Sequence, residues 1–295
     1  VKFSLKAKPT IEGAGVSLHR VFGFGDNKPF DPFLMMDDFR NDEPDQYIKG
    51  FPWHPHRGIE TITYVLRGTV EHADSLGNKG LLSDGDLQWM TAGSGIIHQE
   101  MPKGNNDGKM HGFQLWANLP SSQKMTAPRY QDIKCSEFNS IVEDDGTTIK
   151  VIAGNFRGYK GPVDGIAAKP KYLDIYIPPS KLKRFPFDTR RQGFAYIFEG
   201  SANFHNASKP FGVKVEKELN GEEIELRDMS GNRTLVVFDH GDEVAVRAGE
   251  NGVRFLLISG RPLKEPVAWH GPIVMNTQEE LRQAFNELNN GTFIK

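Results

Sequence analysis

Hydrophobic and polar residues alternate with a period of two along much of this chain, and glycines close the alternating runs. Residues 60–68 (ETITYVLRG) form one run, and residues 85–93 (GDLQWMTAG) form a turn followed by a second. Residues 110–119 form a third, which places Phe113 and Leu115 on one face. Because β-branched and aromatic residues favour strands, this pattern predicts an all-β protein of many short strands.

The strand pattern occurs twice, which indicates a duplicated unit. Residues 64–70 (YVLRGTV) are echoed by residues 196–202 (YIFEGSA). The Gly85-Asp86 turn, with an Ala-Gly pair six residues on, is echoed by Gly241-Asp242 with the same spacing. Two echoes in the same order predict duplication of one β unit, and therefore two tandem β-barrels.

We place the first barrel domain at residues 1–130 and the second at residues 131–295. One helix is expected near the C-terminal end, because Thr277 and Glu280 have the spacing of a capping box. An apolar stripe of helical period follows this box, at Leu281, Ala284, Phe285 and Leu288. We expect the helix to pack across a sheet or between the two barrels.

Four metal-ligand side chains stand in two pairs of identical spacing. His54 and His56 begin one stretch, and His98 and Glu100 follow the Gly-Asp turn. Residues two apart on a strand point to one face, so both pairs can converge inside a barrel. Three imidazoles and one carboxylate favour a divalent transition metal with open coordination positions, as in iron chemistry. The first domain is therefore predicted to hold a metal centre.

The second domain is predicted to keep the barrel and to lack these ligands. The positions that align with the four ligands through the two echoes are Pro186, Asp188, Arg254 and Leu256.

Some polar residues near the predicted site have two interpretations. Asp37 and Asp38 close an apolar run, and we favour a plain turn over partners of the ligands. We interpret His72 and His111 as satisfied core or surface residues, the alternative being donors that orient a ligand ring.

Composition limits the function classes. With 36 basic and 38 acidic side chains, the net charge of −2 gives no global field that would attract nucleic acid. The single cysteine, Cys135, forbids an internal disulfide, and no apolar run is long enough to span a bilayer. We expect a cytoplasmic monomer without nucleic-acid or membrane partners. A local basic cluster, a candidate surface for a protein partner, comprises Lys181, Lys183, Arg184, Arg190 and Arg191.

Two longer stretches resemble the pirin signature within the cupin superfamily. They are residues 51–61 (FPWHPHRGIET) and residues 85–102 (GDLQWMTAGSGIIHQEMP), and the resemblance continues to residues 270–277 (HGPIVMNT). In the general cupin motif the carboxylate position matches Glu60. Pirins similar to this chain take the carboxylate from the second motif, here Glu100, so Glu60 is the minority alternative.

The resemblance implies a bicupin, with two tandem barrels of jelly-roll type and Fe(II) in the first barrel, for which Mn, Ni, Cu, Co or Zn can substitute. Similar proteins oxidise flavonols such as quercetin with dioxygen, so the resemblance implies a flavonol 2,3-dioxygenase. Glu100 is then expected to accept the proton of the substrate's 3-hydroxyl group, and Phe51, Phe113 and Leu115 to stack on the flat substrate.

Other similar proteins are metal-dependent regulators that bind a transcription factor or a metabolic enzyme. A redox-switched binding protein is therefore the alternative function. A sugar isomerase or zinc cupin would need charged pocket walls, which the apolar sequence around the site disfavours.

Overall fold

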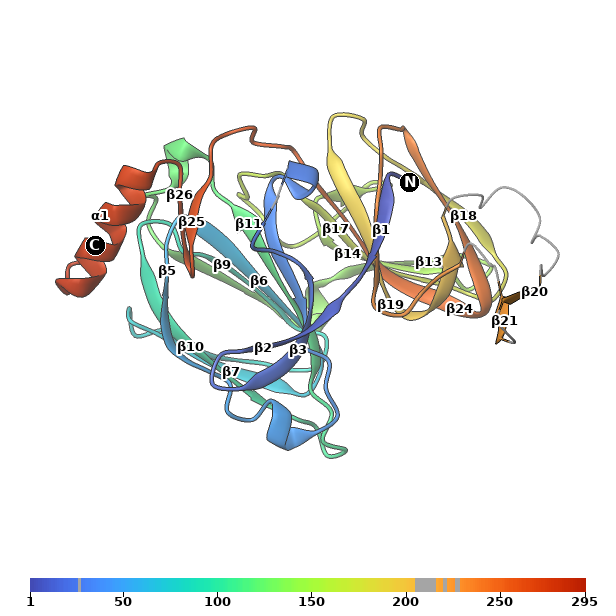
Figure 1. The fold of residues 1–295 in the computed structure, drawn as a ribbon, viewed down its shortest axis with the longest axis horizontal. Coiled ribbons are helices and arrows are strands. Elements are labelled where there is room, and N and C mark those ends of the chain that lie inside the picture. The colour runs from blue at the N-terminus through green and yellow to red at the C-terminus, as the bar shows by residue number, and fades with distance from the viewer. Residues whose placement is uncertain (26–27, 205–215, 220–221, 226–228) are drawn as a thin grey trace.

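The computed structural model describes residues 1–25, 28–204, 216–219, 222–225 and 229–295. Two β-barrels lie side by side, with one helix at the end of the molecule beside the first barrel (Figure 1). The predicted all-β class, with two barrels and a C-terminal helix, is confirmed. The strand ladders are antiparallel, as expected for short alternating strands joined by tight glycine turns.

Two sheets form the first barrel. The seven-stranded sheet contains, in spatial order, β12 (Arg129–Ile133), β9 (Leu87–Thr91), β6 (Ile59–Arg67), β11 (His111–Asn118), β4 (Phe33–Asp38), β3 (Val16–Phe22) and β2 (Lys8–Glu12). The four-stranded sheet opposite contains β5 (Phe51–His56), β10 (Ile96–Lys103), β7 (Thr69–Asp74) and β8 (Lys79–Leu82).

The second barrel is built from a nine-stranded sheet. It contains β1 (Phe3–Lys6), β23 (Thr234–Val237), β19 (Gln192–Asn203), β24 (Glu243–Gly260), β17 (Lys171–Ile177), β14 (Thr148–Ala153) and β13 (Asn139–Val142), with β18 (Leu182–Pro186) on β24 and β22 (Ser230–Gly231) on β19. Two-stranded sheets pair β15 (Asn155–Phe156) with β16 (Tyr159–Lys160), β20 (Glu216–Leu219) with β21 (Glu222–Glu225), and β25 (Ala268–His270) with β26 (Ile273–Met275). The 3₁₀ helices are Lys28–Phe30, Pro44–Gln46, Ser121–Gln123 and Cys135–Glu137.

Both ends of the chain cross the predicted domain boundary. β1 lies in the sheet of the second barrel, where Phe3 pairs with Val237. At the other end, β25, β26 and the helix α1 (Gln278–Asn289) pack against the first barrel, and Arg57 donates a hydrogen bond to Glu287 at 2.8 Å. The division at residues 130 and 131 is therefore wrong for the two termini, which exchange between the barrels.

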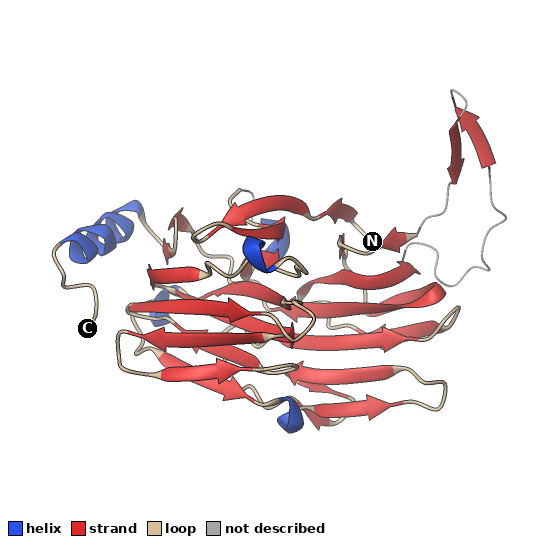
Figure 2. Ribbon diagram, turned by 90° about the horizontal axis from the view of Figure 1, so that it is seen from below, coloured by secondary structure: helices blue, strands red, loops and turns tan. Residues whose placement is uncertain are grey.

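The helix α1 begins as its sequence predicts. Thr277 Oγ1 accepts a hydrogen bond from the Glu280 amide at 3.1 Å, and Glu280 Oε2 accepts one from the Thr277 amide at 2.9 Å. Leu281 and Ala284 are buried against β25 and β26. Figure 2 shows α1 standing at one end of the molecule, so it covers neither the broad faces of the barrels nor their junction. Within the described residues, no helix is long and apolar enough to cross a membrane.

The largest hydrophobic cluster lies between the two barrels. The first barrel contributes Phe33, Trp89, Phe113 and Leu115 among others, and the second contributes Tyr172, Phe194, Tyr196 and Leu256. Two reciprocal hydrogen bonds cross this junction. Tyr64 of the first barrel donates to Asp174 of the second at 2.8 Å, and Tyr196 of the second donates to Asp38 of the first at 2.7 Å.

Strand pairing confirms the repeat and corrects its alignment. Tyr64 pairs with Phe113 on β11, as Tyr196 pairs with Leu256 on β24. The 18-residue strand β24 therefore replaces both β10 and β11: its second half corresponds to β11, and its first half corresponds to β10. The predicted equivalence of Arg254 and Leu256 with His98 and Glu100 is wrong for this reason.

The corrected equivalents follow from two registers. In the first barrel Val70 pairs with Pro102, and in the second its counterpart Ala202 pairs with Ala248. Pro102 therefore corresponds to Ala248, and counting back along each strand aligns His98 and Glu100 with positions 244 and 246. His54 pairs with His98 as Phe185 pairs with Val244. The residues equivalent to His54, His56, His98 and Glu100 are therefore Phe185, Phe187, Val244 and Val246, in place of the four predicted from the sequence echoes.

Candidate metal centre

Three histidines converge inside the first barrel. His54 on β5 lies directly opposite His98 on β10, and His56 follows two residues along β5 on the same face. One ring nitrogen from each residue lies within 4.8 Å of those of the other two. Among the described residues, this is the one group of three or more histidine, cysteine or acidic side chains with such a geometry. The convergence predicted from the His-x-His spacing is therefore present.

Backbone carbonyl groups orient two of the rings. Nδ1 of His54 lies 2.8 Å from the Pro52 carbonyl oxygen, and Nδ1 of His56 lies 3.2 Å from the Pro272 carbonyl oxygen. Because a carbonyl oxygen only accepts, each neutral ring carries its hydrogen on Nδ1 and presents the Nε2 lone pair to the centre. The two Nε2 atoms are 3.1 Å apart.

The third ring supports the same conclusion. His98 is buried, and neither of its ring nitrogens has a hydrogen-bond partner within the protein. Burial, followed by the neighbouring histidines, lowers the pKa of His56 and of His98 well below 6.5, so both rings are neutral at pH 7. Converging neutral imidazoles with free lone pairs fit a divalent transition-metal ion.

Glu100 lies beside this group and remains a predicted ligand. Its side chain lines the same cavity as His54 and His56, and its Oε1 accepts a hydrogen bond from Thr63 at 3.0 Å. Thr63 Oγ1 also lies 2.7 Å from the side-chain amide of Gln114. Thr63 Oγ1 is the donor and Gln114 Oε1 the acceptor in this contact, and because a hydroxyl group has one hydrogen, Thr63 donates either to Glu100 or to Gln114 at any moment. This chain of contacts fixes the carboxylate at the edge of the cavity.

A cavity of about 470 Å³ opens from the histidines. Its wall is mainly apolar and includes Val16, Leu18, Phe39, Phe51 and Trp116. Phe51 lines this cavity, and its contact with a substrate stays a prediction.

The same prediction is wrong for Phe113 and Leu115. Both are fully buried in the cluster between the barrels and do not line the cavity. Phe113 and Leu115 do share one face of β11, as their spacing predicts, but this is the outer face. Gln114 and Trp116, which alternate with them, face the cavity.

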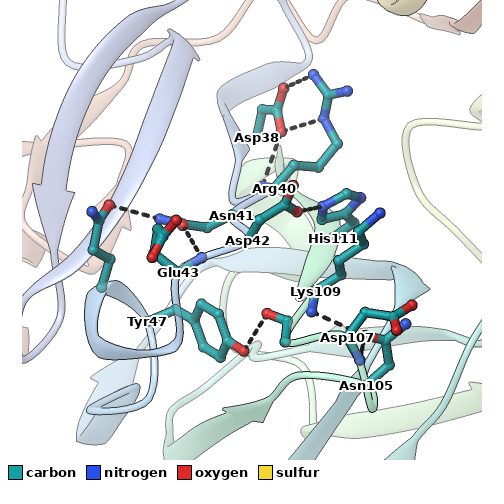
Figure 3. A network of polar contacts seen from close by, with 12 residues as sticks. Asp38, Arg40, Asn41, Asp42, Glu43, Tyr47, Asn105, Asp107, Lys109 and His111 are labelled. Carbon is teal, nitrogen blue, oxygen red and sulfur yellow. Dashed lines mark hydrogen bonds and ion pairs between the residues drawn. The ribbon is translucent and has the colours of Figure 1, made fainter.

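Asp37 and Asp38 form no turn, contrary to the favoured interpretation. They are the last two residues of the buried strand β4. Asp37 lines the cavity and binds the Arg20 guanidinium through two contacts, at 2.9 and 2.8 Å. Asp38 faces the opposite way and accepts from Arg40 at 2.5 Å (Figure 3). It also accepts the hydrogen bond from Tyr196.

The strand geometry argues against Glu60 as a ligand. Glu60, Ile62 and Tyr64 share one face of β6, which is the face towards the second barrel, whereas Thr63 faces the cavity. Glu60 accepts a hydrogen bond from Thr91 at 2.8 Å. Burial raises its pKa from 4.5 to about 7.

The two other histidines lie in separate environments. His72 is buried, stacks on Tyr130 with ring centroids 5.8 Å apart, and has Nε2 3.4 Å from Asp132. His111 has Nε2 2.5 Å from Asp42, in the polar network of Figure 3, and does not line the cavity. The contact of His111 agrees with its interpretation as a satisfied residue. The same interpretation is not confirmed for His72, because neither of its buried ring nitrogens has a hydrogen-bond partner within the protein.

The C-terminal segment covers one side of the site, which the sequence did not predict. Gly271 and Pro272 line the cavity, and Pro272 provides the carbonyl oxygen that orients His56. Two buried basic side chains hold this segment. Arg57 donates to Glu287 and to the Phe293 carbonyl group, and Lys124 Nζ donates to the carbonyl groups of Gly58 and Val274.

The basic cluster of the second barrel is largely paired with carboxylates. Lys183 contacts Glu143 and Asp145, Arg184 contacts Glu243, and both Arg190 and Arg191 contact Asp188. Four carboxylates thus lie against four of the five cations of the cluster, which leaves little net charge on that face.

The sequence matches two family models. The model described as Pirin matches residues 15–117, and the model described as Pirin C-terminal cupin domain matches residues 172–294. A pirin-like protein of Caulobacter vibrioides is 41% identical over 98% of this chain and 97% of its own length. Human pirin is 37% identical over 98% of this chain and 92% of its own length.

Solved structures agree with these sequence matches. The crystal structure of quercetin 2,3-dioxygenase from Acinetobacter baumannii superposes with a TM-score of 0.83 at 28% identity, covering 99% of this chain and 96% of that one.

Proposed function

This chain belongs to the pirin family, and from that premise we propose that it is an iron-dependent dioxygenase that cleaves flavonols such as quercetin. The observation that carries the proposal is a group of three histidines, two of which, His54 and His56, line a cavity of about 470 Å³ with mainly apolar walls. Such a cavity suits a flat aromatic substrate and disfavours a sugar. The Acinetobacter enzyme with the same fold supports the choice of substrate class.

His54, His56, His98 and Glu100 would hold the metal ion. A bound Fe(II) ion supplies Lewis acidity and one-electron chemistry towards dioxygen. The carbonyl groups of Pro52 and Pro272 keep two of the imidazoles in the tautomer that ligation requires. Manganese, nickel, copper, cobalt and zinc also bind imidazole and carboxylate ligands and are the expected substitutes.

Glu100 is the proposed proton acceptor. A flavonol must lose the proton of its 3-hydroxyl group, and Glu100 is the cavity-lining carboxylate beside the histidines. Thr63 donates to one of its oxygens at 3.0 Å and so keeps the carboxylate directed at the cavity, where it can take the proton. The apolar walls, including Phe51 and Trp116, exclude water and bind the flat ring system.

The test is turnover of quercetin by protein that has been loaded with Fe(II) without oxygen and then exposed to air. We expect loss of the quercetin absorbance with release of carbon monoxide. Glu100→Gln should lower kcat by about 100-fold or more, since it removes a general base. Glu60→Gln, on the outer face of the same barrel, is the matched control and should retain activity. The proposal is wrong if no metal supports turnover.

The alternative function is a redox-switched protein that binds a partner. It rests on the presence of a second barrel without the metal ligands and on the basic cluster. Four carboxylates pair with that cluster, which weakens the argument from the basic cluster. Comparing partner recovery by ferrous and ferric protein separates the two functions, because only the alternative requires a difference.

A further inference from the structure

A row of polar side chains crosses the floor of the cavity, one from each strand. The register pairs Thr63 on β6 with Gln114 on β11, Gln114 with Asp37 on β4, and Asp37 with Arg20 on β3. All four residues line the cavity, whose walls are otherwise mainly apolar. The row begins at Thr63, which contacts Glu100, and ends at the Arg20–Asp37 ion pair.

The length of this row matches an aromatic molecule of two or three rings. Neighbouring strands lie about 4.8 Å apart, so Asp37 is roughly 10 Å from Thr63 across the sheet. A substrate that reaches Glu100 with one end therefore reaches the ion pair with the other.

The far end of the row is rich in hydrogen-bond acceptors. Arg20 donates twice to Asp37 and also contacts Glu12 at 2.9 Å. Among the described residues that line the cavity, Arg20 is the single lysine or arginine. One guanidinium against two carboxylates leaves a net charge of −1. Each carboxylate has about four acceptor positions, so lone pairs remain after Arg20 is satisfied.

Arg20 is also fixed from its other side. Its guanidinium carbon lies 4.9 Å from the centre of the Phe24 ring, and Phe24 lines the same cavity. A fixed guanidinium holds Asp37 in one orientation, so the acceptor end is preorganised for donors placed on a flat ring.

We propose that Arg20 and Asp37, with Glu12, determine specificity by recognising hydroxyl groups on the substrate ring remote from the metal centre. The preferred ligands are polyphenols that carry phenolic O–H donors at that end, and Asp37 is the principal acceptor. This inference rests on the proposed function for the orientation of the substrate.

The experiment measures dissociation constants without oxygen, with metal-loaded protein and three flavonols. The three share the same 3-hydroxy-4-oxo group and carry no hydroxyl, a 4′-hydroxyl, or 3′,4′-dihydroxyl groups on the remote ring. In the unmodified protein we expect the dihydroxyl compound to bind about tenfold more tightly than the unsubstituted one, as for hydrogen bonds to a charged acceptor.

Asp37→Asn and Arg20→Met should bring this ratio close to one while the unsubstituted flavonol binds almost as before. Arg184→Met, which breaks a comparable arginine–carboxylate pair on the second barrel, should keep the ratio. Each ratio is taken within one variant, so a partial loss of folded protein cancels. Asp37→Asn conserves shape and serves if Arg20→Met does not fold.

Equal affinities for the three flavonols in the unmodified protein would overturn the inference, and so would variants that weaken all three by one factor. If the flavonols bind but none is oxidised in air, the dioxygenase proposal is wrong and the ratios still decide the inference. If none binds, both are wrong.

Discussion

The two barrels share a fold and differ most in the side chains that fill them. At the four positions where the first barrel has His54, His56, His98 and Glu100, the second has Phe185, Phe187, Val244 and Val246. Phe185, Val244 and Val246 are buried in the core of the second barrel, and Phe187 packs against it. The first barrel instead surrounds a cavity of about 470 Å³.

This difference shows that the barrel does not need a metal ion to fold. An apolar interior of tightly packed side chains is the stable solution for such a barrel, since every buried methylene adds about 0.8 kcal/mol. Buried imidazoles without partners are costly by comparison. The site residues of the first barrel therefore lower its free energy of unfolding when no metal is bound. Replacing them with the residues at the equivalent positions of the second barrel tests this statement.

The largest effect is expected from His98→Val, which installs the residue of the second barrel. Metal analysis should show that bound metal falls from one equivalent to a small fraction, with loss of quercetin turnover. Because His98 has two buried, unpartnered nitrogens, the metal-free variant should be at least as stable as the metal-free parent, within about 1 kcal/mol. Urea unfolding in the presence of a chelator measures this.

Metal should stabilise only the parent protein. At a free metal concentration of 100 times Kd, a site that binds only the folded state adds about 2.7 kcal/mol. Stoichiometric iron in His98→Val would show that the ligand set is wrong.

The next effect concerns Glu60, whose equivalent in the second barrel is Gln192. Burial raises the pKa of Glu60 from 4.5 to about 7, so the folded state binds more protons than the unfolded state between these values. The stabilisation of the protonated carboxyl is thus complete below pH 4.5 and is lost as the pH rises through 7.

Relative to Glu60→Gln, the parent protein should lose about 3 kcal/mol of stability between pH 4.5 and 7. Urea unfolding of both proteins at several pH values gives the difference. The metal content of Glu60→Gln should be unchanged. A fall in metal content would restore Glu60 as a candidate ligand.

The sequence predicted the components of the site better than their surroundings. The period of two places His54 with His56 on one face without any tertiary information, and this held. The same rule put Phe113 and Leu115 together correctly, but periodicity cannot tell the cavity face from the face that packs against a second barrel. Residues on different strands, such as Arg20 and Asp37, come together only through register, which no local pattern reveals.

The C-terminal cover was missed for the same physical reason. Proline-rich residues 262–276 have no periodicity, and their position depends on Arg57 and Lys124, more than 140 residues away in the sequence. The alignment of the repeat failed where one strand, β24, replaces two. Glycine turns locate strand ends well, and a continuous strand that changes partners leaves no such mark.

A moderate effect is expected from Arg57→Met, because this cover belongs to the first barrel. Arg57 is 2% exposed and holds Glu287, which keeps Lys295 at 2.9 Å as a second partner. The loss should therefore be about 2 kcal/mol, below that of a fully isolated buried charge. Loosening of Pro272 should also weaken metal binding about tenfold, since outer contacts orient ligand rings.

Competition with a chelator measures the metal affinity of Arg57→Met, and Arg184→Met on the second barrel is the control. Unchanged metal affinity together with reduced stability would mean that the cover is structural only.

The smallest effect tests the symmetry of the junction. Tyr64 donates to Asp174 and Tyr196 donates to Asp38, and each carboxylate keeps an arginine, Arg254 at 2.7 Å and Arg40 at 2.5 Å. Replacing either tyrosine by phenylalanine removes one hydrogen bond without isolating a charge, so each variant should lose about 1.5 kcal/mol.

Metal content should be unchanged in both tyrosine variants, because these hydroxyl groups lie on the outer faces of the barrels. The double variant should lose the sum within about 0.5 kcal/mol if the two bonds act independently. Urea unfolding of the three proteins decides this. A loss of unfolding free energy in Tyr64→Phe alone would show that the contact of the Tyr64 hydroxyl group with Lys150, at 3.3 Å, matters more than its bond to Asp174. The two halves of the junction would then be equivalent in geometry but not in energy.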